Sequence, residues 1–197
     1  IWNRLISRQH PLKGAPLVGR QLRYLIWAGA EVVGAFGFGP AAYYLSCRDS
    51  WIGWDARAQE QNRDRVIGLS RFLIRPELHC ANLASRAYRL VLGRVAQDWF
   101  ARYGIRPVLV ETYVDRSTYT GKSLAAANWL RLGQSLGRGR TSASKAHRPK
   151  SRKDVWVWLL NRRARQRLQE RSLPPVVARS IFSPSDQGHW VAEELDG

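Results

Sequence analysis

The stretch "NLASRAYRLVLGRVAQDWFARYG" (residues 82–104) decides the fold, because it is the strongest helical pattern in the chain. Asn82 is a typical N-cap and Gly104 a typical C-terminal stop, and the apolar stripe between them consists of Leu83, Ala87, Leu90, Val91, Val95 and Trp99. Strand-like segments lie on both sides, "VIGLSRFLI" (66–74) and "PVLVETYVD" (107–115). A strand–helix–strand unit of this length predicts a parallel pair with a right-handed crossover, and therefore an α/β fold.

The segments further out add strands and flanking helices to a mixed sheet. We expect a helix at 2–10, a hairpin of strands at 21–27 and 31–38, a polar helix or turn at 55–66, a short helix at 123–130 and a last strand at 154–160. The apolar region 27–47 contains four glycines and Pro40, which favour two strands around a turn over a membrane span. We therefore expect no membrane association.

Composition separates this chain from most globular domains through its charge. Its 197 residues are 45% hydrophobic, which is typical of a packed domain, but the net charge of +17 requires an anionic partner. Nucleic acid, an anionic membrane and an acidic protein all meet that requirement. Cys47 and Cys80 are too few for a secreted disulfide framework, and no signal peptide is visible. We expect a cytoplasmic, nucleoid-associated protein, and we expect the sequence to be a fragment because it begins at Ile1.

A basic run interrupts the apolar pattern at "SLGRGRTSASKAHRPKSRKD" (135–154). Thirteen Lys or Arg residues lie between 131 and 171, against Asp154 and Glu170. Arginine binds phosphate oxygens bidentately, and counterion release drives association, so DNA is the expected partner; a solvated loop that only aids solubility is the alternative. The expected contacts, which continue onto a basic helix at 160–172, are Arg138, Arg140, Lys145, Arg148, Lys150, Arg152, Lys153, Arg162, Arg163 and Arg165.

Four residues form the candidate catalytic corner. Glu111 and Asp115 lie four apart on one strand, so both side chains point to the same face, and Arg71 on the neighbouring strand could pair with Glu111. Asn128, at the end of the short helix, closes the same region beside Trp129. A general base with its orienting group is one interpretation, and a structural ion pair at the sheet edge is the other.

Two further motifs were weighed for chemistry. "RDSWIGW" (48–54) could line a nucleotide cleft, although Trp51 and Trp54 buried beneath a turn explain it as well. His79 and Cys80 are adjacent, and the sequence has no Cys-x-x-Cys spacing, so we expect no metal site.

Several motifs in order resemble the DruA-like family, which is named for a component of the Druantia antiphage system. They are "LVGRQLRYLI", "RDSWIGW", "SRFLI", "NLAS", "PVLVETYVD", "AANW" and "LGQSLGRGR", and the resemblance covers residues 2–160. The element order is also similar to the GNAT acetyltransferase fold, which implies a gap between the parallel strands for acyl-CoA and a glycine-rich pyrophosphate loop at the helix N-terminus. The matching loop here, "RPELHCANLAS" (75–85), contains no glycine. We therefore expect no cofactor and disfavour acetyl-CoA.

The C-terminal tail carries a second resemblance. "SIFSPSDQGHWVAEELDG" (180–197) resembles the opening of the DNA-binding region of DDE cut-and-paste transposases, which implies a DDE domain further along the same chain as a partner. The expected organisation is a GNAT-like domain at 1–160, a basic helix and linker at 161–180, and the start of the transposase-type region at 181–197. The expected function is a DNA-binding accessory domain in transposition or antiphage defence. The alternative is an acyl- or group-transferase that acts on a nucleobase or a protein.

Overall fold

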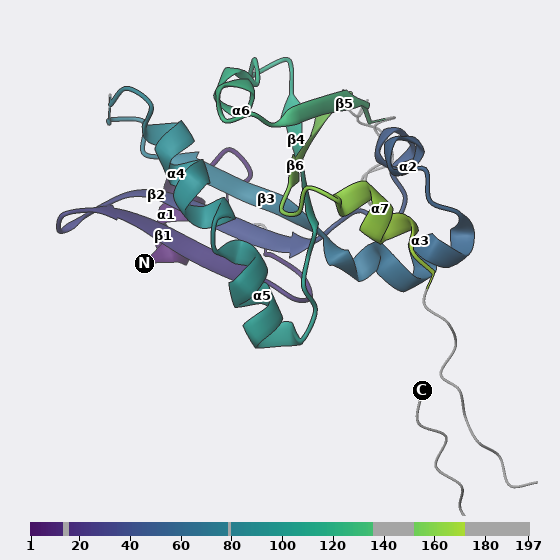
Figure 1. Cartoon of the computed structure of the whole chain (residues 1–197). Coiled ribbons are helices and arrows are strands. Elements are labelled where there is room, and N and C mark those ends of the chain that lie inside the picture. The colour runs from purple at the N-terminus through teal and green to yellow at the C-terminus, as the bar shows by residue number, and fades with distance from the viewer. Residues whose placement is uncertain (14–15, 79, 136–151, 172–197) are drawn as a thin grey trace, which may run out of the picture.

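The computed structural model describes residues 1–13, 16–78, 80–135 and 152–171, and a six-stranded mixed sheet forms its centre (Figure 1). The strands follow the order β1-β2-β3-β4-β6-β5. Only β3 and β4 pair in parallel, while every other neighbouring pair is antiparallel. The strands are β1 (Leu22–Ala28), β2 (Glu31–Pro40), β3 (Val66–Ile74), β4 (Leu109–Asp115), β5 (Leu130–Gln134) and β6 (Lys153–Leu159). This arrangement confirms the predicted α/β fold with a parallel crossover.

Seven α-helices and one 3-10 turn accompany the sheet in the described parts of the chain. They are α1 (Trp2–Gln9), α2 (Ser46–Ile52), α3 (Ala56–Asn62), η1 (Arg63–Arg65), α4 (Leu83–Leu92), α5 (Val95–Tyr103), α6 (Lys122–Ala126) and α7 (Ala164–Gln169). The crossover from β3 to β4 consists of α4 and α5, which lie in front of the sheet in Figure 1. None of these helices is long and apolar enough to cross a membrane.

The single helix predicted at 82–104 is wrong in one respect, because it is two helices that meet at Gly93 and Arg94. Glycine is a weak helix former, and the new helix starts where Arg94 Nε donates to Asp98 Oδ2 at 2.7 Å. The break still leaves Val95 and Trp99 on the sheet, at 0% and 2% exposure. The predicted apolar stripe is confirmed at Ala87, Val91, Val95 and Trp99, which are buried, but it is wrong at Leu90, which is 65% exposed.

Two other elements differ from the prediction. The short helix expected at 123–130 ends at Ala126, and Leu130 already belongs to the edge strand β5, which was not predicted. A bulge between Arg131 and Gly133 interrupts the β5 ladder, and its alternation is correspondingly weak. Trp51 and Trp54 of the motif at 48–54 were expected to be buried beneath a turn, but both are only half-buried, and residues 48–52 belong to α2.

The two faces of the sheet carry separate cores. Along β4, Val110 packs into the cluster beneath α4, α5 and α6, whereas Leu109 packs into the cluster that includes α7. Strand alternation explains this division, because neighbouring side chains point to opposite faces. A third, smaller cluster joins α1 to β2 and β3 through Ile6, Ala35 and Leu73.

The parallel pair is short, and this feature positions the site. Only three residues of each strand face one another, from Val66 opposite Leu109 to Gly68 opposite Glu111. One further contact follows, from Thr112 Oγ1 to the Leu69 carbonyl at 2.9 Å. Beyond it, both strands continue without a ladder between them, as the resemblance to GNAT proteins implies. Glu111 therefore lies at the point where the two strands separate.

Candidate nucleic-acid interface and buried ion pair

Glu111 is held by Arg48, and not by Arg71 as predicted. The carboxylate Oε2 lies 2.8 Å from Arg48 Nη1, and both side chains are 0% exposed. Arg71 lies three residues beyond Gly68, the residue opposite Glu111, and donates from Nη1 to the Ser70 carbonyl at 2.7 Å. Burial opposes the charge on Arg48, but Glu111 and Asp49 together raise its pKa above the usual value. Arg48 therefore keeps its positive charge inside the protein.

The other two members of the predicted corner lie elsewhere. Asp115 is about 13 Å along the strand from Glu111, and its Oδ1 accepts from the backbone N–H and the hydroxyl of Ser117 at 3.0 and 2.6 Å. Asn128 is exposed after α6 in a left-handed conformation, with φ of 61°. The structure thus contradicts the predicted pairing of Glu111 with Arg71, while a catalytic role for Asp115 and Asn128 stays a prediction.

The residues around Glu111 form a polar network in which both carboxylate oxygens are satisfied. Glu111 Oε1 accepts from the backbone N–H of Ala42 at 2.8 Å and from the Tyr113 hydroxyl at 2.9 Å. Burial, followed by the nearby Glu111 charge, raises the pKa of Tyr113 above its usual value. Glu111 cannot reach a ligand directly, whereas Tyr113 is 37% exposed. Sequence reasoning missed Arg48, Asp49 and Tyr113, although the first two stand in the "RDSWIGW" motif.

This network fixes the short segment between β2 and α2 at both of its ends. Arg48 Nη1 donates to the Ala42 carbonyl at 2.8 Å, and Asp49 Oδ2 accepts from the Leu45 backbone N–H at 2.8 Å. Arg48 Nε also donates to Asp49 Oδ1 at 2.8 Å, so the two fixed points are joined through side chains. The residues between them, Tyr43 and Tyr44, are 58% and 71% exposed.

The predicted nucleic-acid contacts divide into a described and an undescribed part. Arg162, Arg163 and Arg165 line an open surface hollow of about 460 Å³, together with Leu159, Gln166 and Gln169. The Arg165 guanidinium lies over the ring of Trp51, 5.3 Å from its centroid. Arg152 and Lys153 stand where the chain enters β6. The remaining predicted contacts lie outside the described residues, as does the tail at 180–197, and they are Arg138, Arg140, Lys145, Arg148 and Lys150.

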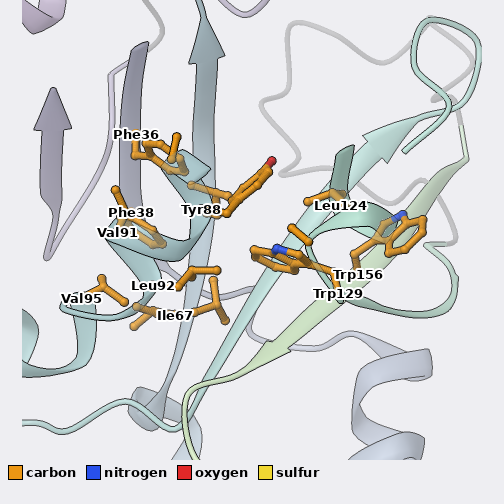
Figure 2. Close-up of a cluster of buried hydrophobic side chains, with 14 of the residues drawn as sticks. Phe36, Phe38, Ile67, Tyr88, Val91, Leu92, Val95, Leu124, Trp129 and Trp156 are labelled. Carbon is orange, nitrogen blue, oxygen red and sulfur yellow. The ribbon is translucent and has the colours of Figure 1, made fainter. Parts of the chain in front are cut away.

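On the opposite face, aromatic side chains fill the region between the separating strands. Tyr88 stacks on Phe72 of β3 with ring centroids 4.4 Å apart, and it meets Trp129 edge-on at 5.7 Å. Leu124 completes the cluster, which Figure 2 shows around Tyr88 and Trp129. Tyr88, Leu124 and Trp129 are each 4% exposed or less. Acyl-CoA bound between the strands would have to displace these side chains.

The loop before α4 does not fit a pyrophosphate either. A cradle of backbone N–H groups usually relies on glycine for close approach, and residues 75–85 include none. Asn82, at the start of α4, takes up the left-handed conformation with φ of 59°. Arg75 is already paired with Glu31, at 2.7 Å, and with Glu77. The described residues therefore do not match an acyl-CoA site as they stand.

A family model described as Druantia protein DruA matches residues 1–164. The chain belongs to the DruA family. This confirms the resemblance found in the sequence motifs. The match ends within α7, and the resemblance of the tail to transposases is not part of it. The DruA assignment by itself does not specify which residues act.

Comparison with solved structures returned acetyltransferases. The chain is 14% identical to the aminoglycoside acetyltransferase AAC(6')-Ib, solved in complex with coenzyme A, with a TM-score of 0.43 over 75% of this chain and 69% of that one. It is 10% identical to the spermidine/spermine N-acetyltransferase SpeG from Vibrio cholerae, with a TM-score of 0.43 over 71% and 65%. Values of this size do not by themselves establish a shared activity. No curated protein matches the chain.

Within the described parts of the chain, no group of three or more His, Cys, Asp or Glu side chains gathers in a way that could hold an ion. Cys47 is partly buried and Cys80 is exposed. Burial is the main cause that raises the pKa of the Cys47 thiol.

Proposed function

We propose that this member of the DruA family is a DNA-binding domain. It holds duplex DNA through Arg162, Arg163 and Arg165, which lie at the start of α7, and through the basic run at 135–154. The observation that carries the proposal is the open hollow beside α7, which Arg162, Arg163 and Arg165 line. Guanidinium groups at a concave surface match the phosphate oxygens of a nucleic-acid backbone. The net charge of +17 supplies the long-range attraction.

A DNA-binding domain of this kind can serve as an accessory to a catalytic domain. We propose that the domain delivers DNA to a catalytic partner, such as a DDE transposase domain further along the chain. The resemblance of the tail at 180–197 to transposases supports this role, and DruA membership favours antiphage defence as the alternative setting. Transposition and phage-restriction assays on the full-length protein, with and without residues 1–171, test which setting applies.

Salt dependence tests the DNA-binding proposal directly. Binding of a labelled duplex should weaken steeply as salt rises, because each neutralised phosphate releases a counterion. The triple variant Arg162→Gln/Arg163→Gln/Arg165→Gln should reduce the slope of log K against log salt by roughly 3, at about 0.9 for each phosphate contact. Fluorescence anisotropy over a salt series measures this slope.

A matched control separates a local interface from overall charge. Arg86, Arg89 and Arg102 are exposed on α4 and α5, and replacing them by glutamine removes the same net charge from the opposite face of the sheet. The control variant should keep the slope within one phosphate contact of the parent. Equal losses in both triple variants, or absence of duplex binding by the parent at low salt, would contradict the proposal.

The acyltransferase alternative has one structural feature in its favour, the separation of β3 and β4 beyond Gly68 and Glu111. It predicts that acetyl-CoA stabilises the protein, by about 2.7 kcal/mol at a hundredfold excess over its dissociation constant. Because Tyr88 and Trp129 fill the region between the strands, we expect no thermal shift. A clear shift would favour the transferase over the binding domain.

A further inference from the structure

Tyr43 and Tyr44 are exposed, so burial in the core does not explain why two aromatic residues stand here. Tyr43 and Tyr44 leave 58% and 71% of their surface in solvent, so they contribute little to the core. Yet their backbone is fixed on both sides, at Ala42 by Arg48 and Glu111 and at Leu45 by Asp49. A fully buried ion pair is costly to desolvate and is weak support for stability alone. Here it holds two exposed aromatic rings in place.

The two tyrosine rings contact each other and lie beside arginine side chains, so aromatic faces and positive charge occur together on this surface. The two rings meet edge-on with centroids 4.6 Å apart. The Arg63 guanidinium lies over Tyr43, 4.0 Å from the ring centroid, and adds a cation to the same surface. At the other end of α2, Arg165 covers Trp51 in the same way. Tyr43, which precedes α2, and Trp51, in the last turn of α2, are thus each covered by an arginine from another element.

We propose that Tyr43 and Tyr44 form a stacking site for unpaired nucleobases, so that the chain binds a single strand of nucleic acid at this surface. The choice of nucleic acid rests on the proposed function and on the charge of the chain. Single strands are the fitting form because bases within a duplex stack on one another and hide their faces. Tyrosine offers a base its ring, and a fixed backbone lowers the entropy lost on binding.

The arrangement also assigns separate tasks to the two surfaces. The α7 hollow offers only guanidinium and amide groups beside Leu159, which suits a phosphate backbone of either form. The tyrosine pair offers ring faces, which suit only bases that are out of the stack. A DNA segment opened next to a bound duplex would engage both surfaces.

The test compares two probes on the intact chain. A labelled oligothymidylate, which cannot pair with itself, and a labelled duplex of the same length are titrated by anisotropy at one salt concentration. The Tyr43→Ala/Tyr44→Ala variant should bind the oligothymidylate tenfold weaker or more, since each stacked base is worth roughly fivefold to a hundredfold. Its duplex affinity should change less than twofold. Tyr43→Phe/Tyr44→Phe keeps the rings and should bind like the parent.

Salt dependence and a matched control sharpen the result. Stacking releases no counterion, so the alanine variant should lose affinity at every salt concentration with an unchanged slope. Phe100 is the control, because its ring is 45% exposed with the Arg106 guanidinium 4.9 Å above it, yet it lies on α5. Phe100→Ala should bind both probes as the parent does, and thermal melts should show that every variant is folded.

The outcomes separate this proposal from the one on which it rests. A parent that binds duplex but not oligothymidylate leaves the duplex function standing and overturns the tyrosine site. Equal loss of both probes in the alanine variant overturns it too, because the tyrosines would then belong to a general interface. Unchanged oligothymidylate binding in the alanine variant would assign the pair to another ligand, such as a protein, and would also overturn it. Tyrosine-dependent single-strand binding without duplex binding would support this site and contradict the proposed function.

Discussion

Where β3 and β4 separate, the two faces of the sheet use the space in opposite ways. On the face of α4 and α6, Tyr88 and Trp129 close it with a dry aromatic cluster. On the other face, Glu111 and Arg48 place a charged pair at 0% exposure and use it to fix an exposed segment. Buried apolar side chains stabilise the first face. On the second face, the buried ion pair fixes the backbone of exposed residues.

The difference indicates where function should be sought in this family member. The aromatic cluster beneath α4 and α6 is densely packed, so this face of the sheet behaves as core. The charged face connects the interior directly to Tyr43, Tyr44 and Tyr113 at the surface. Four predictions break or sharpen this comparison, and they follow in order of expected effect.

Removing the carboxylate from the charged face should have the largest effect. Glu111→Ala leaves the buried Arg48 guanidinium with Asp49 as its remaining carboxylate partner and should lower the free energy of unfolding by about 3 kcal/mol. Urea denaturation measures this loss. Replacing both residues, as Arg48→Met/Glu111→Leu, should recover part of it, because no fully buried charge is left unpaired, and Asp49, which loses Arg48, is 19% exposed and still accepts from the Leu45 N–H. A double variant as unstable as the single one would show that the hydrogen bonds to Ala42 and Tyr113 matter more than the charges.

On the aromatic face, a smaller ring should cost less. Trp129→Phe removes part of a side chain that is 4% exposed, and the resulting cavity should cost roughly 1–3 kcal/mol in the same denaturation experiment. The same substitution at Trp27, which is 53% exposed, should stay within about 0.5 kcal/mol. If Trp129→Phe were neutral, the gap would be looser than the packing indicates, and acyl-CoA binding to that variant would need to be measured.

Substitutions of Asn128 test whether this predicted catalytic residue is needed only for its left-handed backbone conformation. Its φ of 61° is unfavourable for residues with a Cβ, so Asn128→Ala should cost about 1–2 kcal/mol, whereas Asn128→Gly should be close to neutral. Thermal unfolding of both variants measures the difference. A stable Asn128→Gly variant that failed in a transposition or phage-defence assay would restore a direct functional role for the amide.

The smallest effect concerns pH and lies near α1. Burial, followed by the charge of Arg71, lowers the pKa of His10 from 6.5 to about 4. The unfolded chain therefore binds this proton first as pH falls, and stability present above pH 6.5 should decline towards pH 4. Because His10 is partly exposed, we expect a loss on the order of 1 kcal/mol. His10→Gln should remove this part of the pH dependence, and an unchanged profile would contradict it.

Local patterns were enough to predict most of the fold. The strand at 66–74 was predicted with its observed bounds, and the parallel crossover followed from the helical stripe between two apolar segments. The break at Gly93 was missed because the stripe continues across it in Val91 and Val95. The edge strand β5 was missed because its five residues include a bulge and little alternation.

The site was harder to predict, because its central contact joins residues far apart in the chain. Glu111 was predicted to be either a general base or part of a structural ion pair with Arg71, and the structure shows an ion pair with Arg48 instead. Arg48 is 63 residues away, and its pairing depends on where the chain after β2 crosses β4. Arginine is mostly exposed in proteins, so no sequence rule places one at 0% exposure. Arg162, Arg163 and Arg165, by contrast, were predicted to form a basic surface because they lie close together in the sequence.

The pairing of β5 with β6 has a consequence for how the basic run could change over time. Ser135 donates its backbone N–H to the Lys153 carbonyl at 2.8 Å, so the chain leaves the sheet and returns to it at adjacent positions. The ladder therefore fixes the ends of residues 136–151 whatever lies between them, and lengthening such a connection costs only slowly growing closure entropy. Insertions, deletions or wholesale exchange could accumulate there while the core sequence stays the same. If the basic run binds DNA as proposed, we expect relatives to differ in DNA preference mainly through residues 136–151, and less through the sheet.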